Sequence, residues 1–167
     1  MIKNIEKLEI VDYYPGVMGE IVNSHAVYYY KNWGFDITFE THVAKELSIF
    51  FSEFKKGKDG VWIVRINKSF AGSVAIDGKL ANSEGARLRW FIVKPEFQRK
   101  GIGEVLLEKA LEFCKAVDYR KVFLWTYRGL DIARKLYEHV GFKFQIEKEV
   151  QRWGQNIIEQ KFELSLR

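Results

Sequence analysis

The sequence predicts a mixed α+β domain, in which a mostly antiparallel sheet contains one β-α-β crossover and carries flanking helices. Strand and helix patterns follow one another in the order β-α-α-β-β-β-α-β-α-β-β. The three central strand segments have no helix between them, which favours an antiparallel meander. A long amphipathic helix separates the third of them from the next strand, as in a parallel crossover. With 167 residues the chain fits one domain, expected over 1–167, that can bury a sizeable core.

The first third of the chain carries one strand and two helices. Residues 1–12 alternate weakly through Ile5, Leu8 and Ile10, which indicates a first strand. Apolar and aromatic residues then recur at helical spacing in a first helix, at Ile21, Val22, His25, Tyr28 and Tyr29. After a break at 33–36, a second helix has one apolar face, formed by Phe39, Val43, Leu47, Phe50, Phe51 and Phe54.

Three strand segments follow in the middle of the chain. Segments 61–66 and 71–76 are short apolar runs joined by Asn67-Lys68-Ser69, which is typical of a hairpin turn. Segment 86–93 is the third strand. Its two faces are Leu88, Trp90 and Ile92 on one side and Arg89, Phe91 and Val93 on the other.

The last third alternates between helices and strands. A helix has its buried stripe at Leu106, Leu107, Ala110, Leu111 and Cys114. Strand 122–126 is continuously apolar up to its last residue, which indicates a strand covered on both faces. A further helix repeats the helical spacing at Ile132, Ala133, Leu136, Tyr137 and Val140 and ends at Gly141. Two final strands, 144–153 and 158–166, complete the predicted order.

Composition and charge exclude several classes of protein. The chain is 47% hydrophobic and 29% charged, which is ordinary for a globular domain. The net charge of +5 would suit nucleic acid, but acids are interleaved with the basic residues, so a nucleic-acid partner is not expected. No stretch approaches the ~18 apolar residues of a membrane span and no apolar signal segment is present, so we expect a cytoplasmic protein without a membrane partner. The three histidines have no metal-ligand spacing, and the single cysteine allows no internal disulfide.

One glycine-containing segment lies between a strand and a helix. This segment reads Gln98-x-x-Gly101-x-Gly103 and does not match a P-loop. It also fails the dinucleotide fingerprint, because Leu106 occupies the position of the third glycine. Its glycines still allow a ligand to approach the backbone, and free N–H groups of the first helical turn favour an anion such as a pyrophosphate. Arg99 and Lys100 add positive charge at the rim. A plain strand-to-helix turn is the alternative, and this segment alone leaves both interpretations open.

Its context resembles the GNAT acetyltransferase superfamily. Segment 88–103, LRWFIVKPEFQRKGIG, is similar to the acetyl-CoA signature, in which a strand ending V-x-P precedes [Q/R]-x-x-G-x-[G/A] and a helix. Segment 133–142, ARKLYEHVGF, resembles the A-x-x-L-Y-x-x-x-G-F segment, and the likeness covers 5–166. A narrower likeness is to the acetyltransferase half of bacterial proteins that join a winged-helix regulator to a GNAT domain. It lies in segments 25–30 and 33–40, in LRWF at 88–91 and in FLWT at 123–126. We expect that catalytic half standing alone.

The resemblance implies a GNAT-like fold and acetyl-CoA as co-substrate, with no metal. The backbone of Phe91, Ile92 and Val93 would pair with the pantetheine arm, and one N–H group there would stabilise the oxyanion. The pyrophosphate would be wrapped by Gln98, Arg99, Lys100, Gly101, Ile102, Gly103 and Glu104. Arg134 would reach a phosphate of coenzyme A, unless it is only a solvated helix residue.

The resemblance also implies a direct transfer to a primary amine. Tyr137 occupies the position of the general acid that protonates the departing thiolate, although tyrosine is equally good core filler at this position. Glu40 is our preferred general base, because it follows Phe39 on the helix that would cover the acceptor. Asp36, His25, Glu84 and a chain of water molecules remain open alternatives for that role.

One departure from the family pattern affects the site. Leu130 stands three residues before Ala133, where many members have asparagine, so Asp131 or Thr126 would have to replace it. We therefore expect an N-acetyltransferase acting on a small molecule or on a peptide or protein amine, with a non-catalytic acyl-CoA-binding or sensing module as the alternative. Exposed final strands often support dimers in this superfamily, so a homodimer is also open.

Overall fold

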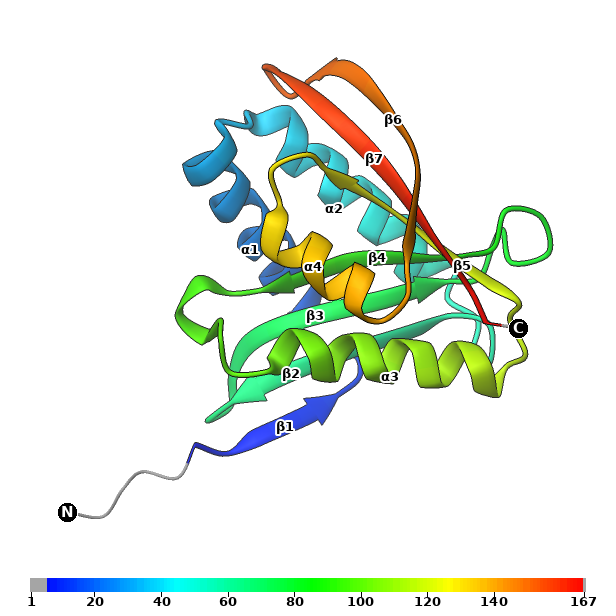
Figure 1. Ribbon diagram of the computed structural model, residues 1–167. Helices are drawn as coiled ribbons and strands as arrows, with labels where there is room; N and C mark the ends of the chain where they lie inside the picture. Colours follow the sequence, from blue (N-terminus) through cyan, green and yellow to red (C-terminus); the bar gives the residue numbers. More distant parts are fainter. Residues whose placement is uncertain (1–5, 167) are drawn as a thin grey trace.

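The computed structural model describes residues 6–166 and contains one seven-stranded sheet in the order β1-β2-β3-β4-β5-β7-β6 (Figure 1). The strands are β1 (Leu8–Val11), β2 (Gly60–Ile66), β3 (Ser69–Asp77), β4 (Ala86–Val93), β5 (Lys121–Tyr127), β6 (Lys143–Arg152) and β7 (Gln155–Ser165). The helices are α1 (Val17–Trp33), α2 (Ile37–Ser52), α3 (Ile102–Ala116) and α4 (Asp131–His139), with a 3-10 turn at Pro95–Phe97.

The predicted α+β class and element order are confirmed. Neighbouring strands are antiparallel except for β4 and β5, which are parallel and are connected through α3 as the one crossover. Helix α3 packs on β2, β3 and β4, and Figure 1 shows α1 and α2 on the opposite face of the sheet. The connection therefore brings the glycine segment, at the start of α3, to the end of β4.

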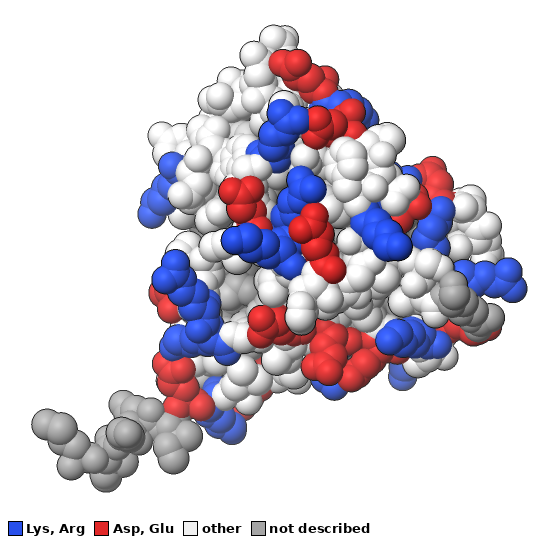
Figure 2. All heavy atoms as spheres, viewed as in Figure 1, with Lys and Arg blue, Asp and Glu red and all other residues white. Residues whose placement is uncertain are grey.

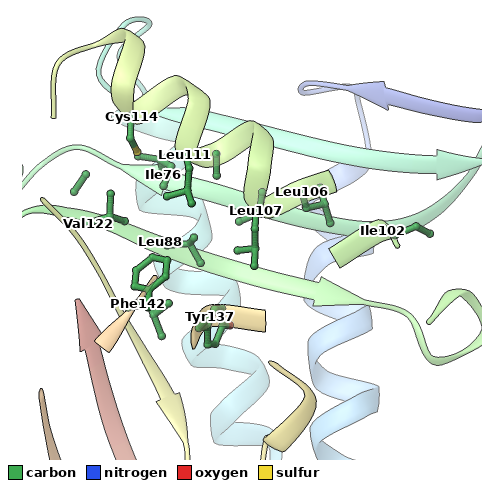
Figure 3. Packing of buried hydrophobic residues seen from close by; sticks show 14 of the residues in the cluster. Ile76, Leu88, Ile102, Leu106, Leu107, Leu111, Cys114, Val122, Tyr137 and Phe142 are labelled. Carbon is green, nitrogen blue, oxygen red and sulfur yellow. The ribbon is translucent and has the colours of Figure 1, made fainter. Parts of the chain in front are cut away.

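The main core lies between α3 and the sheet. The predicted stripe of α3 is buried, and Figure 3 shows it against residues of β3, β4 and β5 such as Ile76, Leu88 and Val122. Strand β5 lies between β4 and β7, and its Phe123 and Leu124 are buried on its two faces, as its apolar run predicts. The thiol of Cys114 belongs to this core, where burial raises its pKa to about 12, as for a structural cysteine.

Local signals explain where several elements begin and end. Helix α1 ends at Gly34, whose φ of 69° lies in the left-handed region. Asp36 caps α2 by accepting a hydrogen bond from the Thr38 N–H at 2.9 Å. The predicted β2–β3 hairpin is confirmed, and its two turn residues Asn67 and Lys68 both have positive φ, the geometry of a tight hairpin.

Some boundaries differ from the sequence expectation. The first strand comprises only Leu8–Val11, and residues 1–5 of its expected range lie outside the described residues. Helix α2 ends at Ser52, so Phe54 follows the helix and is partly exposed. Periodicity did not reveal this end, because the apolar face continues by one more position beyond the last helical turn.

The core position of Leu107 gives a test of this packing. Leu107 is fully buried in the α3 stripe, so Leu107→Ala should lower the free energy of unfolding by about 2–5 kcal/mol through lost contacts and a residual cavity. The neighbouring Glu108→Ala, on the exposed side of α3, should change it by no more than about 0.5 kcal/mol. Urea denaturation of both variants measures the difference, and equal losses would contradict this placement of α3.

Candidate active site

The sheet opens where β4 and β5 part. These strands pair only at Ala86–Val122 and Arg87–Phe123, and Figure 1 shows them diverging beyond that point. The edge of β4 that faces β5 therefore has no strand partner from Leu88 to Val93, and its backbone polar groups, apart from the Val93 carbonyl that accepts from Gln98, are available to a ligand.

A bulge in β4 accompanies the opening. Trp90 has a φ of 46°, and the register with β3 shifts between Ser73 and Ala75. The buried Ser73 hydroxyl donates a hydrogen bond to the Trp90 carbonyl at 2.8 Å. A bulge bends its strand and increases the local twist, which explains how β4 leaves the direction of β5.

A cavity of about 600 Å³ occupies the opening. Its wall combines β4 and β5 with α1, α2, α4 and the start of α3. This volume is within the range of small-molecule and cofactor sites. The cavity therefore extends from the glycine segment to the two N-terminal helices.

The glycine segment forms one end of this cavity. Gly101 has a φ of 78° and immediately precedes α3. A Cβ on Gly103 would lie 3.0 Å from Leu136 Cδ1 and 3.3 Å from Phe91 Cζ, so glycine allows α3 to pack closely on α4 and β4. The first N–H groups of α3 have no partner within the helix and face this end with the positive end of the helix dipole. The residues present fit a phosphate-bearing ligand.

Most of the predicted loop residues line the cavity, namely Gln98, Arg99, Gly101, Ile102, Gly103 and Glu104. The Gln98 side chain donates from Nε2 to the Val93 carbonyl at 3.1 Å, which fixes the loop to the end of β4. Lys100 is not part of the wall, since its Nζ lies 2.7 Å from the Glu6 carboxylate.

The remaining predicted cofactor residues divide into two groups. Phe91, Ile92, Val93, Thr126 and Asp131 line the cavity, as does Leu130 at the start of α4. Arg134 does not line it. Its Nε lies 2.9 Å from Glu138 Oε1 and its guanidinium lies over the Phe162 ring at 5.3 Å, because this side of α4 faces the C-terminal strands.

Tyr137 is brought to the centre of the site. It is buried on α4 among the core residues shown in Figure 3, 5.7 Å from the Phe91 ring between centroids. It also lines the cavity. Among residues 6–166, no group is hydrogen-bonded to its hydroxyl. Burial raises the pKa of Tyr137, so the hydroxyl keeps its proton at neutral pH but is a weaker acid than an exposed tyrosine.

The base candidates lie mostly outside the cavity. Glu40 and Glu84 are exposed and are not part of its wall, and Asp36 caps α2. The helical period of α2 explains this for Glu40, because it turns Phe39, Val43 and Glu46 inward instead. The role assigned to Glu40 stays a prediction, and this placement does not favour it.

His25 is the one sequence-based base candidate, among Glu40, Asp36, His25 and Glu84, that lines the cavity. Its Nδ1 lies 2.7 Å from the Ile21 carbonyl, so Nδ1 carries the proton and donates it. Burial lowers the pKa of His25 to about 4, which keeps the ring neutral at physiological pH but makes it a weak base.

Sequence reasoning missed a polar group at the other end of the cavity, formed by His42, Glu46, Arg87 and Arg89. Arg89 bridges two carboxylates, at 3.1 Å from Glu46 and 3.2 Å from Asp77, and hydrogen bonding to Arg89 lowers the pKa of Glu46. Burial lowers the pKa of His42. The sequence did contain a signal for this polar group. Arg87 and Arg89 occupy alternate positions of an otherwise apolar strand, which places two cations on one covered face of the sheet.

Aromatic rings close the same end. Trp153, in the turn between β6 and β7, packs on Phe39 at 4.9 Å and on Phe35 at 5.1 Å between ring centroids. The Asp36 N–H also donates to the Trp153 carbonyl at 3.0 Å. Both ends of the chain therefore contribute to this wall, which the sequence order alone did not indicate.

Most of the chain matches one known protein family. The model of the acetyltransferase (GNAT) family matches residues 20–142, which include the glycine segment, β4 and Tyr137. The chain belongs to the GNAT family. Neither this match nor those below concern a winged-helix partner, so the likeness to the fused subgroup stays a prediction.

Two archaeal relatives of this GNAT chain are described as uncharacterized N-acetyltransferases. The protein from Methanocaldococcus jannaschii is 33% identical over 100 residues, which are 58% of this chain and 43% of the relative. The protein from Archaeoglobus fulgidus is 33% identical over 86 residues, 49% of this chain and 58% of the relative. The chain thus aligns with about half the length of these relatives.

Solved structures share the fold of the GNAT chain. A GNAT-family acetyltransferase from Staphylococcus aureus Mu50 has a TM-score of 0.78 at 15% identity, over 96% of this chain and all of that one. A protein from Salmonella typhimurium, described as an acetyltransferase and solved with its cofactor acetyl-CoA, has a TM-score of 0.72 at 14% identity, over 96% and 94% of the two chains.

The remaining features of the described part of the GNAT chain concern metal-ligand clusters, membrane-spanning helices and basic surface patches. Within residues 6–166, no three His, Cys, Asp or Glu side chains gather as metal ligands, and no helix is long and apolar enough to cross a membrane. Figure 2 shows basic and acidic side chains interspersed over one face, where a nucleic-acid site would need a basic stripe. That nucleic acid is not a partner stays a prediction.

The burial of His25 predicts a pH dependence of stability. Its pKa in the folded chain is about 4, below the ordinary value of 6.5, so the unfolded chain binds the proton more tightly. The contribution is present above pH 6.5 and is lost as the pH falls toward 4, by up to about 3 kcal/mol. His25→Gln should flatten this part of the curve in denaturant titrations, whereas the exposed His139→Gln should not. Parallel curves for all three proteins would contradict a neutral buried His25.

Proposed function

We propose that this GNAT protein is an acetyl-CoA-dependent N-acetyltransferase that transfers the acetyl group to a primary amine by direct attack in a ternary complex. The observation that carries the proposal is the single cavity along the unpaired edge of β4. It joins the anion-binding start of α3 to a polar and aromatic end under α1 and α2, so two substrates can meet in one space. A small molecule or a peptide or protein amine would both fit this description.

The start of α3 and β4 would hold the co-substrate. The backbone of Phe91–Val93 has no strand partner on this edge. Its polar groups there, other than the Val93 carbonyl that Gln98 already contacts, would pair with a pantetheine arm in the manner of an added strand. The α3 N-terminus and the loop from Gln98 to Glu104 would receive the pyrophosphate. Asp131 and Thr126 line the cavity beside Leu130. Lys100 and Arg134 would have to leave Glu6 and Glu138 before either could contact a phosphate. Acetyl-CoA supplies an activated acetyl group as a thioester.

Two proton transfers accompany the reaction. The amine nitrogen forms its bond to the acetyl carbon as the carbon–sulfur bond breaks, and the departing thiolate takes the proton of the Tyr137 hydroxyl. The proton lost by the amine would leave through water to the neutral His42, which lines the cavity and is partly exposed. Bulk solvent then returns a proton to Tyr137. His42 thus joins the earlier base candidates.

Tyr137→Phe tests the acid. The variant keeps the ring packing and loses the proton donor, so kcat should fall about 100-fold while the Kd for acetyl-CoA changes less than about twofold. Release of free coenzyme A with an amine panel measures the first, and calorimetry the second. Tyr30→Phe, an exposed residue outside the cavity, is the matched control and should behave as wild type. Unchanged turnover of Tyr137→Phe would overturn the assignment.

Gly101→Asp tests the co-substrate end. It adds a side chain at positive φ and a negative charge where the pyrophosphate would bind, so the rise in melting temperature given by acetyl-CoA should disappear. Gly57→Asp has the same strain, with a φ of 83° and open space around it, but lies outside the cavity wall. It should keep the full rise. A shift that both variants retain would refute this end of the site.

Leu130 favours a second candidate function, a non-catalytic acyl-CoA-binding or sensing module. Its side chain makes no capping hydrogen bond at the start of α4, where an asparagine would offer one. Such a module would still be stabilised by acetyl-CoA but would release no coenzyme A with any amine. Retention of a protonated, unbonded Tyr137 hydroxyl in the cavity supports the enzyme.

A further inference from the structure

The polar end of the cavity contains two arginines in different states. Arg89 already has partners for its charge, because Glu46 and Asp77 both contact its guanidinium. Its Cζ also lies 4.2 Å from the centroid of the Trp90 ring. Among residues 6–166, Arg87 forms no hydrogen bond or ion pair, and its Nε is buried without a partner. Burial and the charge of Arg89 lower the pKa of Arg87.

The carboxylates nearby do not satisfy Arg87. The four charges of Glu46, Asp77, Arg87 and Arg89 sum to zero, but both carboxylates are directed at Arg89. Asp77 also accepts a hydrogen bond from the Lys79 N–H at 3.0 Å. Arg87 is therefore a partly desolvated cation with open donors in the cavity wall, and buried donors of this kind are normally satisfied by water or by a ligand.

The charge balance selects the kind of partner. A guanidinium pairs with a carboxylate through two parallel hydrogen bonds. Because the four charges already sum to zero, a bound phosphate would leave this end with a net charge of about −2 and a carboxylate with about −1, so the carboxylate meets less repulsion from Glu46 and Asp77. The adjoining walls are aromatic, including Tyr127, Phe39 and Trp153, so the body of the ligand would be apolar.

We propose that the acetyl acceptor is an amine that also carries a carboxylate and an apolar body, an aromatic amino acid or a similar amino acid, and that Arg87 binds the carboxylate. This rests on the proposed function, because it takes this end of the cavity as the acceptor site. Arg87 is a specificity-determining residue in this assignment. Strand β4 places it about 20 Å from Val93, at the opposite end of the strand from the glycine loop.

Matched acceptors test the assignment. L-Phenylalanine carries a carboxylate where L-phenylalaninamide carries a neutral amide, and coenzyme A release gives kcat/KM for each. Because the amide also lowers the pKa of the amine, both values are expressed per unprotonated amine. Wild type should prefer the acid at least tenfold, and Arg87→Gln should remove that preference by lowering kcat/KM for the acid while changing kcat/KM for the amide less than about threefold.

Arg120→Gln is the control, since Arg120 is exposed and lies outside the cavity, and it should leave both kcat/KM values unchanged. Equal use of acid and amide by wild type, or equal loss of both in Arg87→Gln, would overturn the proposal.

A binding measurement separates this proposal from the proposed function. 3-Phenylpropionate has the carboxylate and the ring but no amine, and 3-phenylpropionamide is its neutral match. The acid should bind wild type at least tenfold more tightly than the amide in calorimetry, and Arg87→Gln should lose that difference even if no amine is ever acetylated. Arg87→Lys keeps the positive charge but cannot form two parallel hydrogen bonds to a carboxylate, so it should retain part of the preference for the acid. No preference for the acid in wild type would overturn the proposal, whereas absence of acetyl transfer with the preference intact would overturn the enzyme alone.

Discussion

The parting of β4 from β5 is the constraint on which the site depends. Two neighbouring parallel strands would normally satisfy each other's backbone groups along their whole length, but here the pairing stops after Arg87 and Phe123. The Trp90 bulge, with its carbonyl held by Ser73, turns β4 away, and its unpaired edge becomes a wall of the cavity. Everything else follows from this: α3 begins at one end of the opening, α4 brings Tyr137 to its middle, and α1 and α2 close the other end.

Most of the fold could be predicted from local sequence patterns. Periods of 3.6 and 2, a hairpin turn and glycines at helix ends were enough to give the element order and the single crossover, because each acts within a few residues. The glycine segment, the β4 residues and Tyr137 were also identified from the sequence and line one cavity. Their chemical roles remain predictions that the experiments above address.

The polar and aromatic end of the cavity was harder to predict, for a physical reason. Its residues come from α2, β4 and the β6–β7 turn, and long-range packing rather than local pattern brings them together. Glu40 was chosen by its place beside Phe39, yet the helix turns Glu46 inward and leaves Glu40 in solvent. Likewise Lys100 and Arg134 were expected at phosphates, but their charges are directed at Glu6 and Glu138. Which carboxylate pairs with which cation depends on the fold as a whole.

The contact between the α1–α2 turn and the β6–β7 turn has a consequence for how the protein becomes active during its synthesis. The main-chain bond from Asp36 to Trp153 and the packing of Trp153 on Phe39 join segments made early and late by the ribosome. The glycine loop, β4 and Tyr137 have all been translated before Trp153 is. Tyr137 itself packs on Phe162 of β7, so the core around it and the aromatic wall both need the last strand. The complete cavity therefore forms only after β7 has been synthesised.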